Sequence, residues 1–215
     1  MKLTIIYDNV VYDKKKGLKS DWGFSCLIED SNYSVLFDTG TKTNVLLDNM
    51  KILNIDPKKI KKIVISHEHH DHNGGLELFL PYANKIDLYR LSTINPENRF
   101  NLIAVDKPQK ITENIFSTGK IHGFIDEQSL VLKGKKGFYV LVGCSHPGVN
   151  NILNISNKFG KIVGIIGGFH GFNQFKILDE LELICPCHCT QYIKEIKDQF
   201  PEKFFDGGVG RIINL

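Results

Sequence analysis

A short histidine-rich string limits what this chain can fold into more than any other part of its sequence. The string reads Ser-His-Glu-His-His-Asp-His-Asn-Gly-Gly and follows the β-branched run of residues 63–65. His67 and His69 are two residues apart, so an extended backbone turns both imidazole rings to one side. Asp71 and His72 follow where the chain must curl, and the glycine pair allows a sharp turn. The string therefore predicts a metal site at the end of a strand.

Histidines follow apolar runs elsewhere in the chain as well. At least one histidine follows within a few residues of the end of each of four runs, at residues 63–65, 140–142, 162–166 and 183–184. In α/β folds, ligands bind at the C-terminal ends of the strands. Four strands that each deliver an imidazole to that edge favour a metal site over four unrelated core histidines. Six of the eight histidines take part: His67, His69, His72, His146, His170 and His188.

The remaining two histidines are not expected to bind metal. His70 points to the other side of an extended segment, and His122 stands alone and is interpreted as structural.

The string and the later histidines suggest two sets of ligands. Three neutral imidazoles suit one zinc-like ion with an open fourth position, and two of them would be His67 and His69. Asp71, His72 and one further imidazole would suit a second ion. The third ligands are expected to be His146 and His188. Two cations about 3.5–4 Å apart can share a hydroxide and stabilise negative charge on a substrate.

The rest of the sequence alternates short apolar runs with helical patterns, which favours an α/β arrangement. Residues 84–130 are the least readable part, and no repeat or linker divides the chain, so we expect a single domain of residues 1–215. The expected helices lie around residues 46–53, 76–80, 152–159, 175–181 and 193–200. The expected strands cover residues 3–7, 24–28, 34–37, 60–66, 138–143, 162–166, 183–187, 204–205 and 212–213.

Composition and charge exclude several classes of function. The longest uncharged apolar stretches are far shorter than the ~20 residues that span a bilayer, so no membrane partner is expected. The net charge is only +3, and the lysine runs at residues 14–16 and 58–62 lack interleaved aromatic residues, so no nucleic-acid partner is expected. Five cysteines, with no export signal at the N-terminus, indicate free thiols and a cytoplasmic protein.

The cysteines also allow a competing interpretation. Cys185, Cys187 and Cys189 alternate, which is typical of a soft-metal or iron–sulfur site. In an extended segment, however, the first and last of them lie ~13 Å apart, and only a bend at Pro186 would bring them together. Cys144 is interpreted as a small buried residue beside His146.

Several motifs together resemble those of the metallo-β-lactamase superfamily. The histidine string is the hallmark of that superfamily, and residues 36–40, Leu-Phe-Asp-Thr-Gly, agree with it. Within the superfamily, the chain is similar to the subgroup named for 7,8-dihydropterin-6-methyl-4-(β-D-ribofuranosyl)aminobenzene-5'-phosphate synthase. The blocks that carry this similarity are Asp8-Asn9, Trp22-Gly23-Phe24-Ser25, Gly-Cys-Ser-His at 143–146, Gly-Gly-Phe-His at 167–170 and His-Cys-Thr at 188–190.

The resemblance implies a four-layer αββα sandwich of two mixed sheets with metals at one edge. It also implies two ligand sets: His67, His69 and His146 for one metal, and Asp71, His72 and His188 for the other. Asp38 is then expected either to orient a ligand imidazole or to cap the turn before Gly40. The bridging Asp of the wider superfamily is missing, and the block that ends in His170 stands in its place. His170 is therefore expected to be a ligand, a proton donor or a substrate contact.

These features predict a metal-dependent hydrolase in which a metal-bound hydroxide attacks an ester, amide-like or phosphoester group of a small, possibly anionic molecule. Asp71 and His170 are the expected catalytic residues, with one or two divalent ions, zinc first and iron or manganese as alternatives. One alternative is a transferase that joins a dihydropterin diphosphate to an aminobenzene-ribose phosphate with loss of pyrophosphate. A further alternative is a non-catalytic iron-binding redox or sensor protein. The sequence leaves the oligomeric state open.

Overall fold

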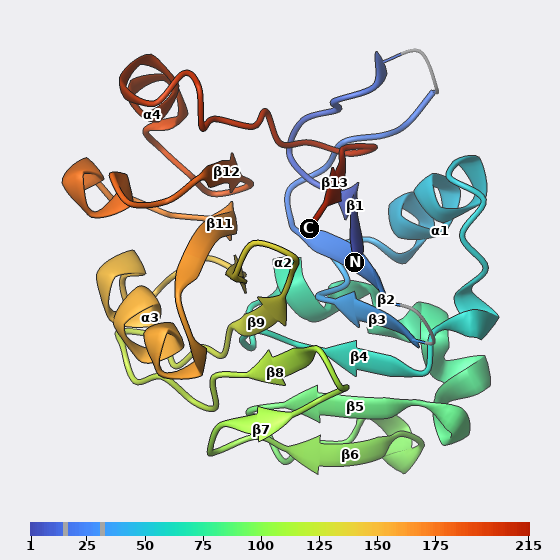
Figure 1. The fold of residues 1–215 in the computed structure, drawn as a ribbon. Coiled ribbons are helices and arrows are strands. Elements are labelled where there is room, and N and C mark those ends of the chain that lie inside the picture. The colour runs from blue at the N-terminus through green and yellow to red at the C-terminus, as the bar shows by residue number, and fades with distance from the viewer. Residues whose placement is uncertain (15–16, 31–32) are drawn as a thin grey trace.

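The computed structural model describes residues 1–14, 17–30 and 33–215 and contains two β-sheets that face one another (Figure 1). Lys15 and Lys16, part of the lysine run considered above, lie outside the described residues. Within the described residues, the first sheet has the order β13-β1-β2-β3-β4-β5-β6, with the bounds Ile212–Asn214, Lys2–Tyr7, Ser25–Asp30, Tyr33–Phe37, Lys62–Val64, Asp87–Arg90 and Asn101–Ala104. The second has the order β12-β11-β10-β9-β8-β7, with the bounds Leu183–Cys187, Ile162–Gly168, Phe138–Val142, Leu130–Lys133, Ile115–Ser117 and Gln109–Lys110.

Helices cover the outer face of each sheet. Figure 1 shows α1 on one side of the pair of sheets and α3 and α4 on the other. The α-helices α1 to α4 span Thr43–Ile52, His70–Asn73, Val149–Ser156 and Ile193–Gln199. The 3₁₀ helices η2 to η6 span Pro57–Lys59, Gly74–Lys85, Pro96–Asn98, Asn157–Phe159 and Phe175–Leu178.

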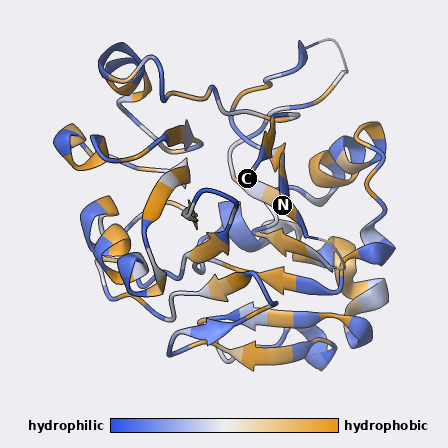
Figure 2. Ribbon diagram, in the orientation of Figure 1, coloured by the Kyte–Doolittle hydropathy of each residue, from blue (hydrophilic) through white to orange (hydrophobic). Residues whose placement is uncertain are grey.

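Three apolar layers hold the four structural layers together. The strands alternate: Val35 and Phe37 of β3 face the second sheet, whereas Leu36 between them faces α1. Likewise Leu141 of β10 lies between the sheets, and Val140 packs under α3. In Figure 2 the strands are largely hydrophobic and the connecting loops largely hydrophilic. This period-two alternation confirms the expected αββα sandwich, because each sheet buries both of its faces.

Most of the strands agree with the apolar runs, but residues 204–205 form no strand, only an isolated bridge between Phe204 and Ile184, and two of the expected helices are 3₁₀ helices. The helical pattern at 76–80 lies within the 3₁₀ helix Gly74–Lys85, which contains Pro81. Proline lacks the N–H that an α-helix needs and clashes with the preceding turn, so a regular α-helix is not formed there. The pattern at 175–181 is also a short 3₁₀ helix, Phe175–Leu178.

The poorly readable segment 84–130 carries the chain from one sheet to the other. It contains β5 and β6 at one edge of the first sheet, then β7 and β8 at one edge of the second. Its strands have two to four residues each, which is too short for a clear alternation.

The strands that matter for the candidate site end at a common edge. Strands β3 and β4 are parallel, as are β10, β11 and β12. The chain takes a positive φ just beyond four of these strands, at Asp38, Ser145, His170 and His188. Residues other than glycine rarely adopt this backbone conformation, and those that do cluster at functional sites. Within the described part of the chain, no helix combines the length and apolarity needed to cross a bilayer.

Candidate metal centre

The histidine string places its side chains around one point at the end of β4. The string bends at residues 66–68 instead of staying extended, and it enters α2 at His70, with His69 at the N-cap. The rings of His67 and His72 have centroids 4.2 Å apart, and Nε2 of His67 lies 3.1 Å from Nδ1 of His69. The string thus gathers three imidazoles, as its spacing predicts.

The second sheet brings two more imidazoles to the same point. The ring centroid of His146, beyond β10, lies 4.8 Å from that of His67 and 4.9 Å from that of His69. The ring of His188, beyond β12, lies 5.0 Å from that of His72. The expected third ligands therefore converge on the string, each beside the pair with which the resemblance groups it.

Asp71 supplies the carboxylate of the cluster. Its Oδ2 lies 3.1 Å from Nε2 of His188 and 3.8 Å from Nε2 of His72. The indole Nε1–H of Trp22 donates to the same oxygen at 2.9 Å. Burial alone would raise the pKa of Asp71, but the hydrogen bond with His188 and the charge of His72 hold it well below its usual range.

The outer nitrogen of three imidazoles is fixed by a neighbouring oxygen. Nδ1 of His72 lies 2.7 Å from Oδ2 of Asp38, which can only accept a hydrogen bond. Nδ1 of His188 lies 2.9 Å from Oδ1 of Asn9, whose Nδ2 donates elsewhere. Nδ1 of His67 lies 2.9 Å from Oγ of Ser66.

The direction of these bonds sets the tautomers. The Ser66 hydroxyl donates its proton to Asp38 at 2.8 Å, so its oxygen accepts from the ring of His67. In neutral rings of His67, His72 and His188, Nδ1 then carries the proton and Nε2 turns its lone pair toward the centre. Metal-ligating histidines are oriented in this way, with the outer N–H on a carboxylate, carbonyl or similar group. Asp38 therefore contacts a candidate ligand, the first of its two expected roles.

The remaining pKa values follow from the crowding of imidazoles. Burial and the nearby rings of His72 and His146 hold the pKa of His67 well below its usual range. Burial and the ring of His69 lower the pKa of His146 to about 4. Burial opposes protonation of His72, but the Asp38 carboxylate outweighs it and raises the pKa. The rings of His67 and His146 are thus kept neutral, as a metal ligand must be.

A divalent cation fits this arrangement of donors. Nε2 of His146 is buried and has no hydrogen-bond partner in the part of the chain that the structure describes. The lone pair of a neutral His188 faces the Asp71 carboxylate at 3.1 Å, which is compatible only with a proton or metal cation between them. Donors around a tetrahedral zinc ion lie roughly 3.3–3.6 Å apart, close to the 3.1–3.8 Å measured here.

Glu127 is a buried carboxylate of the site that the sequence interpretation missed. Its Oε1 accepts the backbone N–H groups of Gly143, Cys144 and Ser145 at 3.0–3.1 Å, and its Oε2 accepts that of His146 at 2.9 Å. Burial raises the pKa of Glu127 to about 7, although these four donors oppose the rise. Glu127 thereby fixes the loop that carries His146.

Asp8 is a second buried carboxylate, and it fixes the backbone that carries His188. Its Oδ2 accepts the backbone N–H of His188 at 3.1 Å, and burial raises the pKa of Asp8 to about 6 against that hydrogen bond and the bond from Val10. Asp8, Asn9 and Trp22 lie in blocks that carry the resemblance, which was the only signal for them. Glu127 had no signal, because it is one of the 24 acidic residues of the chain and lies in the segment that was least readable.

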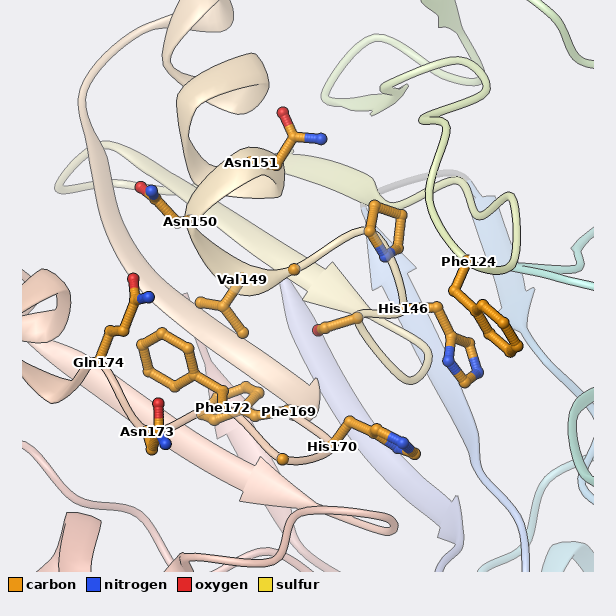
Figure 3. A pocket seen from close by; sticks show the side chains of 14 residues that line it. Phe124, His146, Val149, Asn150, Asn151, Phe169, His170, Phe172, Asn173 and Gln174 are labelled. Carbon is orange, nitrogen blue, oxygen red and sulfur yellow. The ribbon is translucent and has the colours of Figure 1, made fainter.

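His170 lies at the rim of the cluster rather than within it. It is exposed, and its ring centroid is 5.1 Å from that of His146. Both rings border a cavity of about 640 Å³ next to the N-terminus of α3. In Figure 3, His146, His170 and Phe124 lie at one end of the cavity, with the amides Asn150, Asn173 and Gln174 away from them.

The other histidines and most of the cysteines lie outside the cluster. His70 is exposed, and His122 is an exposed residue paired with Asp126 at 3.1 Å. Cys185 and Cys187 are buried between the sheets, with their sulfur atoms 3.9 Å apart. Among the described residues, the groups of donors that could hold a metal contain Cys144 and none of the three alternating cysteines.

Comparisons with known proteins show the family to which the chain belongs. The family model described as the metallo-beta-lactamase superfamily matches residues 23–152, more than half of the chain. A 7,8-dihydropterin-6-methyl-4-(beta-D-ribofuranosyl)-aminobenzene-5'-phosphate synthase of Methanocaldococcus jannaschii is 29% identical, over 91% of this chain and 90% of that protein. An uncharacterized protein of the same organism is 28% identical, over 99% and 100% of the two chains.

A similar solved structure is that of Tm1679, described as a metal-dependent hydrolase of the beta-lactamase superfamily. It matches with a TM-score of 0.79 and 26% identity, covering 100% of this chain and 99% of that one.

Proposed function

Because the chain belongs to the metallo-beta-lactamase superfamily, we propose that it is a metal-dependent hydrolase of a small molecule with an ester, amide-like or phosphoester bond. The observation that carries this proposal is the convergence of five imidazoles and one carboxylate. Within this cluster, the buried Nε2 of His146 has no hydrogen-bond partner among the described residues. Similarity to a protein described as a metal-dependent hydrolase supports the reaction class.

In this proposal the ligands fall into two sets. His67, His69 and His146 hold one divalent cation, and Asp71, His72 and His188 hold the other. Zinc is the first choice for imidazole and carboxylate donors, with iron and manganese as alternatives. A cation bound there lowers the pKa of a coordinated water and stabilises negative charge that develops on the substrate.

The chain's own residues position the reactants. Asp71 accepts a hydrogen bond from Trp22 at 2.9 Å, which fixes the carboxylate while leaving it lone pairs for an attacking water. His170 stands 5.1 Å from His146 between centroids, on the side of the cavity, where it can donate a proton to a leaving group or grip an anionic one. Asp38 and Asn9 keep two ligand rings in their tautomers.

The cavity beside these histidines supports a small-molecule substrate. Its volume of about 640 Å³ lies within the range of ligand pockets. Among the described residues that line it, the polar groups are amides, a hydroxyl and the imidazoles of His146 and His170, and no Lys, Arg, Asp or Glu takes part. The part of the substrate beyond the reacting bond is therefore expected to be uncharged, with groups that bond to amides and pack on Phe172.

A hydrolysis screen tests this proposal. The zinc-loaded protein is incubated with carboxylic ester, thioester, lactone and phosphodiester substrates, beside a His69→Ala variant and a His122→Ala control. We expect turnover of at least one class that is lost in His69→Ala and kept in His122→Ala. Turnover that survives in His69→Ala, or none with any class, contradicts the proposal. In the latter case, visible absorbance that bleaches on reduction would favour the iron-binding redox alternative.

A transferase is the second candidate, because the synthase from M. jannaschii is similar along about nine-tenths of both chains. The same centre would then hold the pyrophosphate that leaves a dihydropterin diphosphate when an aminobenzene-ribose phosphate attacks. Incubation with both substrates separates the two candidates. Pyrophosphate released only when the aminobenzene partner is present supports the transferase, whereas release independent of it supports hydrolysis.

A further inference from the structure

Cys144 differs from the other fully buried cysteines in what surrounds it. Cys26, Cys185 and Cys187 pack in the apolar layer between the sheets, whereas Cys144 is in none of the three apolar clusters of the described residues. Cys144 is nevertheless only 3% exposed. A buried cysteine normally acts as a small hydrophobic residue, but this one is buried among imidazoles.

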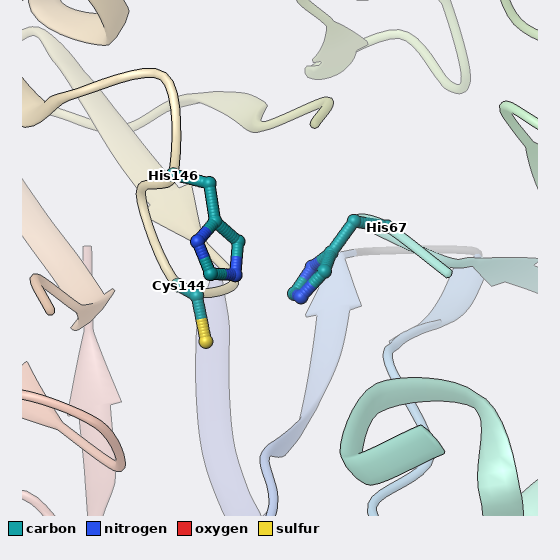
Figure 4. Close-up of side chains that lie close together, drawn as sticks. All are labelled: His67, Cys144 and His146. Carbon is teal, nitrogen blue, oxygen red and sulfur yellow. The ribbon is translucent and has the colours of Figure 1, made fainter. Parts of the chain in front are cut away.

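The sulfur atom of Cys144 faces both sets of candidate ligands. Its Sγ and one ring nitrogen each of His67 and His146 lie within 4.8 Å of one another, and the same holds for Sγ with His72 and His188. Figure 4 shows the sulfur beneath the ring of His146, with both facing His67. One atom therefore belongs to two donor groups that otherwise share no residue.

The imidazoles turn acceptors toward this sulfur. Nε2 of His72 lies 3.1 Å from Sγ, and its Nδ1 is held by Asp38, so a neutral His72 points its lone pair at Cys144. Nε2 of His146 is buried with no hydrogen-bond partner among the described residues. Lone pairs that converge with a sulfur on one region are the arrangement of metal ligands.

The backbone fixes the sulfur before any metal binds. The N–H groups of residues 143–145 all donate to Oε1 of Glu127, and Ser145 has a φ of 59°. The hydroxyl of Ser145 donates to the carbonyl of Gly168 at 2.7 Å, which ties the loop to β11. A side chain on a loop held in this way is preorganised, as ligands of a tight metal site must be.

We propose that Cys144 is a thiolate ligand shared by the two donor groups of the centre. The inference rests on the proposed metal-dependent function, because it adds a ligand to the same centre. When the metal binds, the thiol proton is released to solvent and a metal–sulfur bond forms. The sulfur then supplies a negative charge that both donor groups share. A thiolate ligand makes the centre favour zinc, cobalt, cadmium or ferrous iron over magnesium and manganese.

X-ray absorption at the zinc edge tests the ligand directly in the wild-type protein. We expect a zinc–sulfur distance of about 2.3 Å beside nitrogen and oxygen donors at about 2.0–2.2 Å. Cys144→Ser should lose the sulfur contribution, and Cys185→Ser, a change in the apolar layer, should keep it. A spectrum of the wild-type protein with nitrogen and oxygen donors alone overturns the inference, whether or not the variants fold. Loss of sulfur in Cys189→Ser instead of Cys144→Ser also overturns it.

Binding measurements under a reductant give a second readout. Cys144→Ser should weaken zinc affinity by more than the roughly 10–100-fold that loss of an outer partner costs, and should abolish the thiolate-to-metal absorption of the cobalt-loaded protein. Affinity and absorption like those of Cys185→Ser contradict the inference. The two proposals fail separately. A bound metal without a sulfur ligand overturns only the proposal that Cys144 is a ligand. A sulfur-ligated metal without any turnover overturns only the proposal that the protein is an enzyme.

Discussion

The two sides of the metal centre are built in different ways. On the first sheet, His67, His69 and His72 leave β4 in one short string, and local spacing is enough to gather their rings. On the second sheet, His146 and His188 come from the ends of different strands. His188 itself has a positive φ, and His146 follows Ser145, which also has one. The first side is specified by local sequence, and the second by tertiary structure.

Buried carboxylates make the second side possible. A positive φ at a residue other than glycine costs on the order of 1–3 kcal/mol where it is strained. Glu127 accepts four N–H groups of the loop with Ser145, and Asp8 accepts the N–H of His188. Backbone hydrogen bonds to a carboxylate thus replace the strict spacing that organises the string. The comparison leads to the following predictions.

The largest expected effect is the loss of one ligand from each side. His67→Ala and His146→Ala should both weaken zinc binding by more than about 100-fold, because each removes a direct donor. Competition with a chromogenic chelator measures the affinities, and His122→Ala, at an exposed histidine, is the control. If His146→Ala binds zinc like the wild-type protein, the loop after β10 does not contribute a ligand to the centre.

Glu127→Ala should break the second side while leaving the string intact. The change leaves four backbone N–H groups without their acceptor, so we expect the free energy of unfolding to fall by about 4 kcal/mol. Urea unfolding measures the loss, and Glu113→Ala, at an exposed glutamate, should change little. A Glu127→Ala protein as stable as the control would mean that the loop holds its own conformation.

Asp38→Asn and Asn9→Ala compare the outer partners of the two sides. Asp38→Asn replaces a charged acceptor of His72 by an amide, and Asn9→Ala removes the acceptor of His188. Each should weaken zinc binding by roughly 10–100-fold, and Asp38→Asn by more, because a carboxylate makes the stronger hydrogen bond. No loss in either variant would show that these contacts do not orient the ligands, and an equal loss in both would contradict only the stronger role of the carboxylate.

The smallest expected effect on metal binding is at His170. His170→Gln should keep the metal content, because the ring lies at the rim, and lower kcat by about 100-fold or more if His170 transfers a proton. Plasma mass spectrometry and turnover of the best substrate from the screen measure the two quantities. Metal loss in His170→Gln would make His170 a ligand, one of its three roles expected from the sequence.

The comparison also explains how far the sequence could be read. The strands followed from short apolar runs such as residues 162–166, which are a local signal, whereas the αββα sandwich followed from the resemblance. The histidine string could be recognised because its signal is also local in the sequence. Asp38 and the third ligands needed strand ends or the resemblance, since their partners are far away along the chain. Neither Glu127 nor the place of Cys144 in both donor groups could be predicted, because backbone N–H groups donate to any nearby carboxylate and leave no pattern of residue types.

The most direct test of the account is the metal content of the wild-type protein. After reconstitution with zinc and dialysis against metal-free buffer, plasma mass spectrometry should find at least one and up to two zinc ions per chain. A double variant, His67→Ala with His146→Ala, should hold less than the wild-type protein by at least one ion. Substoichiometric zinc in the wild-type protein, or equal zinc in the double variant, would contradict a metal centre formed by these two sides.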